Sequence, residues 1–176
     1  MKTFIIALLL VSIINTTYSQ EDKSTEDAIA SLKMEELPSV VIKSAGKDFS
    51  VYLPDNNPDK NVKALQRKFI GYRLGKDFEG YDTYLVMMES KKGTLVANYN
   101  ENGKLIRVVE NYKNVILPNA VIYSLFKEYP GWEITNDKFI FSQEDGDITK
   151  KEYTIKMKKG KETRKIVVKP DGEIKK

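Results

Sequence analysis

Three oxygen-bearing side chains at alternating positions are the first residues in the chain that could do chemistry. Asp55, Asn57 and Asp59, in the segment DNNPDKN, match the opening ligands of a calcium-binding loop. The match then fails, because Lys60 stands where the loop needs a turn glycine and Gln66 stands where it needs a bidentate glutamate. We therefore predict a polar loop and no metal site, with calcium as the alternative.

The composition removes the residues on which most catalytic mechanisms depend. The 176-residue chain has no cysteine and no histidine, which excludes thiolate nucleophiles, disulfides, and histidine as a general base or metal ligand. It also has no G-x-S-x-G motif, no phosphate-binding glycine loop and no dinucleotide fingerprint. The sequence therefore predicts a protein that is not an enzyme and that binds no cofactor.

Basic residues gather in the last part of the chain, where they could bind an anion. Residues 149–176 contain eleven Lys and Arg against four Asp and Glu, whereas residues 20–148 contain seventeen against twenty-one. This excess favours a solvated lysine face that protects the edge of a sheet. The alternative is a site for an anionic ligand or partner. Nucleic acid is not a predicted ligand, because the sequence has no known nucleic-acid-binding motif.

Strands with alternating residue types must position these lysines. Apolar and polar residues alternate over residues 153–158, with the period of two that places each set on its own face of a sheet. On this strand and the next, the basic residues expected on the outward face are Lys156, Lys158, Lys165 and Lys169. In an earlier pair of strands, the corresponding outward residues are the apolar Leu85, Met87 and Val96. These seven are the candidate binding residues.

The two pairs of strands lie in segments that resemble each other. Residues 84–105 align without a gap with residues 153–174. Each segment follows a Leu-Pro pair that could begin a helix, because proline is tolerated in the first helical turn. The predicted helices are at residues 37–46 and 117–126.

A duplicated unit of this kind predicts the fold. A small sheet with one apolar face needs a cover, which each helix would supply. We therefore predict an α+β fold of two tandem repeats, at residues 37–110 and 111–176. Each repeat would be a helix plus an antiparallel three- to four-stranded meander, with a strand at residues 69–74 in the first. The helices would lie on one face of one extended sheet or of two abutting sheets.

The N-terminus is typical of an export signal. Lys2 is followed by an apolar run over residues 4–14 and then by small residues, which predicts a signal peptide at 1–19 with cleavage after Ser19. A spanning helix needs about 20 apolar residues, so a membrane anchor is the less favoured alternative. Residues 20–36 form a polar leader, either a helix or an irregular segment. We predict a periplasmic or extracellular protein.

Several short motifs resemble those of a known family. A Leu-Pro pair before a helix, YPGWEI, an alternating Y-x-I-x-M strand and V-x-P-D-G-E-I are similar to the PepSY-like domains, also called beta-lactamase-inhibitor-like domains. These occur in exported proteins of Bacteroidetes-type bacteria. The resemblance covers residues 117–176 and, less closely, 69–106. It implies a helix on an antiparallel sheet, often in tandem, and an envelope location, and it offers no catalytic residue.

Together these observations predict a binding protein. The preferred function is the binding of another exported protein, with inhibition as one form of it, through the outward sheet face near Leu85, Met87 and Val96. The alternative is the binding of an anionic glycan, or peripherally of the membrane surface, by the basic C-terminal half. The sequence does not indicate an oligomeric state.

Overall fold

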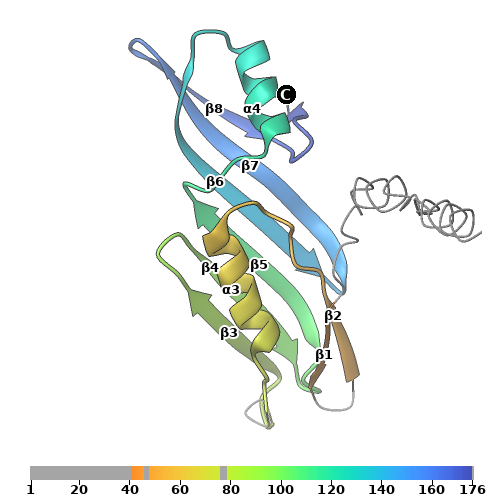
Figure 1. Ribbon diagram of the computed structural model, residues 1–176. Coiled ribbons are helices and arrows are strands. Elements are labelled where there is room, and N and C mark those ends of the chain that lie inside the picture. The colour runs from red at the N-terminus through yellow and green to blue at the C-terminus, as the bar shows by residue number, and fades with distance from the viewer. Residues whose placement is uncertain (1–40, 46–47, 76–78, 176) are drawn as a thin grey trace, which may run out of the picture. The chain divides into compact units, whose positions relative to one another are not determined.

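One continuous antiparallel sheet of seven strands is the main element of the structure (Figure 1). The computed structural model describes residues 41–45, 48–75 and 79–175. The spatial order of the strands follows the chain, with β3 at one edge and β9 at the other. The strands are β3 (Thr83–Glu89), β4 (Gly93–Asn100), β5 (Leu105–Lys113), β6 (Glu133–Glu144), β7 (Asp147–Lys159), β8 (Glu162–Val168) and β9 (Ile174–Lys175).

Two short helices and a hairpin complete the described part of the chain. The hairpin pairs β1 (Val41–Ala45) with β2 (Asp48–Tyr52). Helix α3 (Lys60–Gly71) precedes β3, and helix α4 (Asn119–Glu128) precedes β6. Both helices lie on the same side of the sheet (Figure 1). Within these residues, neither helix has the length and the apolar character needed to cross a membrane.

The predicted fold of two tandem helix-plus-meander repeats is wrong. The structure has a single seven-stranded sheet, and β5 runs across the predicted boundary between residues 110 and 111. Backbone pairing of β5 with β6 joins the two halves over seven residues of each strand. An antiparallel sheet with one covered face can grow strand by strand, so similar segments need not form separate units. The predicted signal peptide and polar leader lie outside the described residues.

The helix predicted at residues 37–46 is also wrong, because Val41–Ala45 forms strand β1. The Leu-Pro pair suggested a helix start, but the adjacent β-branched residues Val41 and Ile42 favour a strand. The backbone of this segment pairs in register with β2. The pairing with β2 and the local β propensity therefore both favour a strand in this segment.

The helix of this half begins later, inside the segment interpreted as a polar loop. The Asp59 carboxylate caps α3 by accepting the backbone N–H of Asn61 at 2.7 Å, which satisfies an otherwise unpaired helical donor. The helix then continues through Phe69 to Gly71, so the strand predicted at residues 69–74 is wrong.

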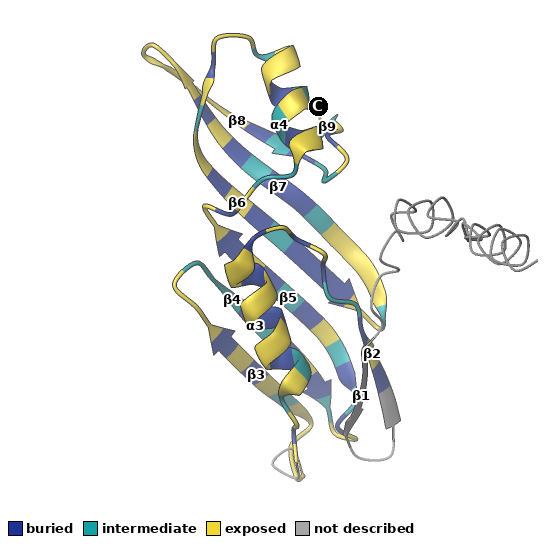
Figure 2. Cartoon of the chain, viewed as in Figure 1, coloured by how far each residue is buried: buried dark blue, intermediate teal, exposed yellow. Residues whose placement is uncertain are grey.

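The helices and alternate strand residues bury one face of the sheet (Figure 2). On α3 the buried residues Val62, Leu65 and Phe69 have helical spacing, and α4 buries Val121 and Leu125. The strands contribute the core residues that alternation predicted, including Val86, Met88, Tyr153, Ile155 and Met157. The predicted direction of these strand side chains is confirmed.

Candidate functional site

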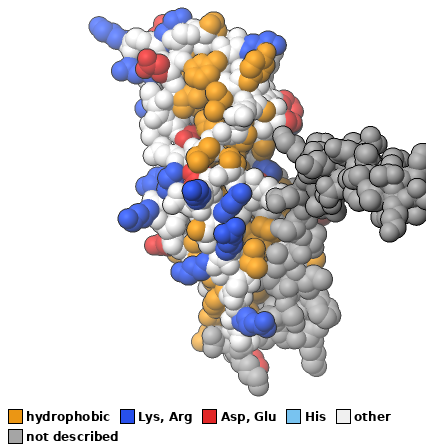
Figure 3. All heavy atoms as spheres, in the orientation of Figure 1, with side chains coloured by type: hydrophobic (Ala, Val, Ile, Leu, Met, Phe, Trp, Pro, Cys, Tyr) orange, Lys and Arg blue, Asp and Glu red, His pale blue; other side chains and the backbone are white. Residues whose placement is uncertain are grey.

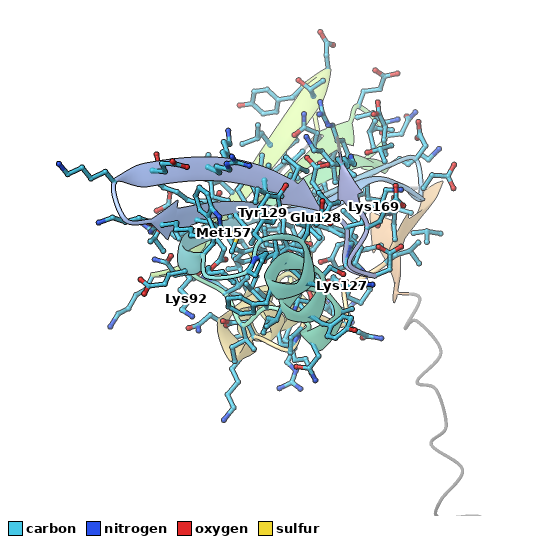
Figure 4. The ribbon with its side chains drawn as sticks, turned by 90° about the horizontal axis from the view of Figure 1, so that it is seen from above. Lys92, Lys127, Glu128, Tyr129, Met157 and Lys169 are labelled. Carbon is cyan, nitrogen blue, oxygen red and sulfur yellow. The ribbon has the colours of Figure 1, made fainter. Side chains whose placement is uncertain are left out.

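The reverse face of the sheet has no described helix or strand against it. On the opposite side, α3, α4 and the segment 50–59 cover the core, and Figure 4 shows α4 on one side of β7 and β8. The segment is held there by Gln143 of β6, whose side chain accepts from the backbone N–H of Leu53 at 2.8 Å and donates to the carbonyl of Val51 at 2.6 Å. We call the reverse side the uncovered face.

An apolar patch lies on the uncovered face near the β3 edge. Leu85 and Met87 are 56% and 57% exposed, and they are adjacent outward residues of β3. Met87 is the cross-strand partner of Val96, which in turn pairs with Val109, and both valines are half-buried. The structure therefore brings together all three predicted apolar residues. Leu85, Met87, Val96 and Val109 are the apolar patch.

The predicted lysines lie farther across the sheet. Lys156 of β7 and Lys165 of β8 are direct cross-strand partners, and both are exposed. Lys158 is also exposed and follows Lys156 in the same alternation. Lys169 is apart from this group, beyond the end of β8, where its Nζ lies 2.6 Å from Glu173 Oε2. This hydrogen bond raises the pKa of Lys169 and engages the lysine locally.

Two adjoining hollows connect the lysines with the strands of the apolar patch. The first, of about 520 Å³, lies across β5 to β8, and the second, of about 480 Å³, lies across β3 to β6. They share the side chains of Lys113 and Lys138, which are cross-strand partners on β5 and β6. Since Thr94 of β4 lines the second hollow, that hollow reaches the strand that carries Val96.

The lining of the first hollow is mainly basic. Its cationic residues are Lys113, Lys138, Lys156, Arg164 and Lys165, and its one acidic residue is Asp137. Arg164 and Asp137 are the cross-strand partners of the buried residues Met157 and Ile155, so their side chains lie on the covered face. Asp137 is buried and accepts the backbone N–H of Val115 at 2.9 Å. Burial raises the pKa of Asp137, although this hydrogen bond opposes the shift.

Most of the cations in the first hollow have no acidic partner in the described part of the chain. Lys113, Lys138, Lys156 and Lys165 form no salt bridge there. Arg164 instead places its guanidinium 5.0 Å from the ring centroid of Trp132. The lysines and the polar groups between them, such as Thr154, are therefore available to an anionic ligand or an acidic protein surface.

The residues Asp55, Asn57 and Asp59 do not converge on a common point for a cation. Asp55 forms a salt bridge with Lys151, and the amide nitrogen of Asn57 donates to the hydroxyl of Tyr153 at 3.0 Å. Asp59 caps α3, as described above. These contacts tie the segment to the sheet, and the described residues contain no group of acidic side chains arranged for a metal ion.

Asp59 is the most heavily engaged of these carboxylates. It is 1% exposed, and its Oδ2 accepts from Lys92 Nζ at 2.9 Å and from the backbone N–H of Ile116 at 3.0 Å. Burial alone would raise its pKa. Hydrogen bonds, first from Lys92 and then from Asn61, outweigh burial and lower the pKa of Asp59 to about 2.

A buried carboxylate on β5 was not predicted from the sequence. Glu110 has no exposed surface, and it accepts from the hydroxyls of Tyr52 at 2.7 Å and Tyr112 at 2.6 Å and from Gln66 Nε2 at 3.0 Å. Burial raises the pKa of Glu110, although the three hydrogen bonds oppose the shift. These contacts join α3 and the segment 50–59 to the sheet.

Sequence reasoning also missed Lys113 and Lys138, which line both hollows. Each alternates with buried aromatic neighbours, Tyr112 and Phe139, which is a readable signal for an outward lysine. Their proximity depends on the pairing of β5 with β6, and twenty-five positions separate the two lysines in the chain. That pairing cannot be read from local alternation.

Comparison with protein-family models, with curated proteins and with solved structures finds no match for this chain. The resemblance to the PepSY-like domains therefore stays a prediction.

Proposed function

We propose that the protein is an exported, non-enzymatic binding module that holds another envelope or extracellular protein on its uncovered face. The observation that carries this proposal is the position of the apolar patch beside the basic hollows on one sheet face. Protein interfaces commonly have an apolar centre and a polar rim. The partner that fits is a protein with an apolar contact surface next to acidic residues.

The exposure of the patch supports this use. Leu85 and Met87 are large apolar side chains, each more than half exposed. They are successive outward residues of β3, so they are neighbours on the same face. A contiguous exposed apolar patch marks an interaction site more often than a single exposed residue does. The unpaired lysines of the hollows add charge that would select an acidic partner and speed its association.

The test is the recovery of a partner from envelope and extracellular extracts of the native cells by the purified protein. The informative variant is Met87→Lys, which places a charge in the apolar patch. Tyr123→Lys is the matched control, because Tyr123 is 70% exposed on α4, where apolar side chains also gather on the surface (Figure 3). We expect Met87→Lys to lower the recovery of one defined protein about tenfold or more, the effect of losing an interface residue worth ~1.4 kcal/mol.

Tyr123→Lys should recover that protein as wild type does. Equal recovery by wild type and by Met87→Lys would refute the role of the apolar patch. A loss with Tyr123→Lys alone would place the binding surface on α4 instead.

A second candidate function rests on the first hollow alone. Its four unpaired lysines, with the polar residues between them, could bind an anionic glycan without the apolar patch. Such binding should weaken steeply as salt rises, because it depends on screened charges. The probe is a heparin column eluted with a salt gradient. Wild type should elute later than the double variant Lys138→Glu/Lys156→Glu, and identical elution would eliminate this function.

A further inference from the structure

The outer edge of β3 is an unguarded strand edge. β3 is the first strand of the sheet, and among the described residues its seven positions pair with β4 alone (Figure 1). The pairing has no register shift over Thr83–Glu89, and the strand contains no proline and no lysine. Natural sheets use bulges, prolines and lysines on edge strands to prevent edge-to-edge pairing. Because β3 has none of the three, its edge is open to another strand.

The opposite edge of the sheet shows the contrast. β9 has only two residues, and the part of β8 that it leaves uncovered carries Glu162, Arg164 and Lys165. A short strand and charged side chains are both ways of blocking an edge. Pairing with another strand is therefore favoured at β3 and disfavoured at β8 and β9.

The hairpin between β3 and β4 determines which backbone groups of β3 point outward. The N–H of Ser90 donates to the carbonyl of Gly93 at 2.8 Å, so these two residues form a hydrogen-bonded pair. Hydrogen-bonded and non-hydrogen-bonded pairs alternate along an antiparallel ladder. Counting back along β3, Val86 directs its N–H and C=O toward β4. The residues that direct these groups outward are Thr83, Leu85, Met87 and Glu89.

The outward residues are complementary to their own copy. We propose that two copies of this chain associate through antiparallel pairing of β3 with β3, with Val86 of each copy on the two-fold axis. In this register Leu85 lies opposite Met87 of the other copy, and Thr83 lies opposite Glu89. Each such pair is a hydrogen-bonded pair, because all four residues direct their backbone groups outward.

The side chains also fit this register. The pairing sets apolar Leu85 against apolar Met87 twice, and it places no glutamate opposite another glutamate. The two sheets become one, and the two apolar patches become neighbours on the same face. A single pair of edge strands buries less than a standard interface, so we expect a dissociation constant on the order of micromolar.

A single introduced cysteine tests the register, because the chain has no other thiol. In the proposed dimer the Val86 pair is not hydrogen-bonded, which puts the two Cα atoms about 4.5 Å apart, within the reach of a disulfide. We therefore expect the purified Val86→Cys protein to form a disulfide-linked dimer under mild oxidation. The matched control is Met88→Cys, because Val86 and Met88 are 7% and 6% exposed on the same face of β3.

The two Met88 residues of the proposed dimer lie four strand positions out of register, about 13 Å along the strands, so Met88→Cys should stay unlinked. Absence of the Val86→Cys dimer, or equal linkage of both variants, overturns the proposed pairing.

A second measurement is the mass of the purified protein by light scattering across a range of concentrations. Wild type should approach the mass of a dimer as concentration rises. Met87→Pro should stay monomeric, because it removes an outward N–H and the side chain opposite Leu85. It removes no hydrogen bond to β4, so its circular dichroism should match that of wild type. A monomeric wild type at every concentration overturns the proposal. Disulfide formation and light scattering are both measured on the purified protein without a partner. A negative result in either therefore does not refute the proposed binding of a partner protein. Likewise, failure to recover a partner does not refute the proposed dimer.

Discussion

Replacement of Glu110 by alanine removes the acceptor of three buried donors. The hydroxyls of Tyr52 and Tyr112 and the amide of Gln66 would lose their partner. Each buried donor without a partner costs about 1–3 kcal/mol, so three cost about 3–9 kcal/mol before the structure relaxes. Removing a desolvated carboxyl and admitting water to the site offset part of this. We expect a net loss of about 3 kcal/mol, a large fraction of the ~5–15 kcal/mol typical of a folded domain.

The conservative variant Glu110→Gln separates charge from hydrogen bonding. Glutamine keeps the volume and one acceptor oxygen, so the loss of unfolding free energy near pH 4 should be about 1 kcal/mol. Burial raises the pKa of Glu110 in the folded protein above its ordinary value of 4.5. The native state therefore keeps a proton that the unfolded state has released, and the stability contributed by Glu110 falls as pH rises above about 4.5.

Glutamine does not titrate, so Glu110→Gln should gain stability relative to wild type as pH rises above about 4.5. The assay is urea unfolding at several pH values, followed by the fluorescence of Trp132, the one tryptophan in the chain. A stability difference that does not change with pH, or that moves in favour of wild type as pH rises, would refute the reasoning. It would show that the three hydrogen bonds outweigh burial.

Two further variants test the polar contacts and the packing of the sheet. Asp59→Asn should lose about 2 kcal/mol of unfolding free energy at neutral pH, because a pKa near 2 in place of the ordinary 3.8 corresponds to roughly that amount. This contribution is present above pH ~4 and disappears as pH falls toward 2, so denaturant curves of the two proteins should converge at acid pH. Gly93→Ala should lose more than about 2 kcal/mol, because an added Cβ would lie 2.2 Å from the carbonyl oxygen of Asn111. The control is Gly71→Ala, which meets no atom within 4 Å, and equal melting temperatures for the two alanine variants would contradict the packing.

Local alternation was enough to predict which strand residues face the core. In β3 and β7, buried residues such as Met88 and Met157 alternate with exposed residues such as Met87 and Lys156, as the period of two requires. Three of the four residues of the apolar patch, Leu85, Met87 and Val96, could therefore be named from the sequence, whereas Val109 was not. The basic hollows could be named only in part, because Lys138 joins them through the pairing of strands that are distant in the chain.

The prediction of a tandem fold was wrong because sequence similarity between two segments does not determine how the segments pair with each other. Both halves supply strands, and the decisive contact is the β5–β6 ladder, which local patterns do not encode. The helix α3 was missed because its polar start was interpreted as a polar loop. An Asp59 cap followed by Val62, Leu65 and Phe69 at helical spacing was a readable signal.

The central claim is that the uncovered face binds a partner protein, and the most direct measurement is photocrosslinking in the native cells. A photoreactive phenylalanine analogue would replace Met87 on the uncovered face or Tyr123 on α4. The account predicts an adduct between position 87 and one defined protein other than the chain itself, and none with that protein at position 123. The adduct should decline when Lys138→Glu is added. An adduct with the same partner at position 123 and none at position 87 would contradict the account.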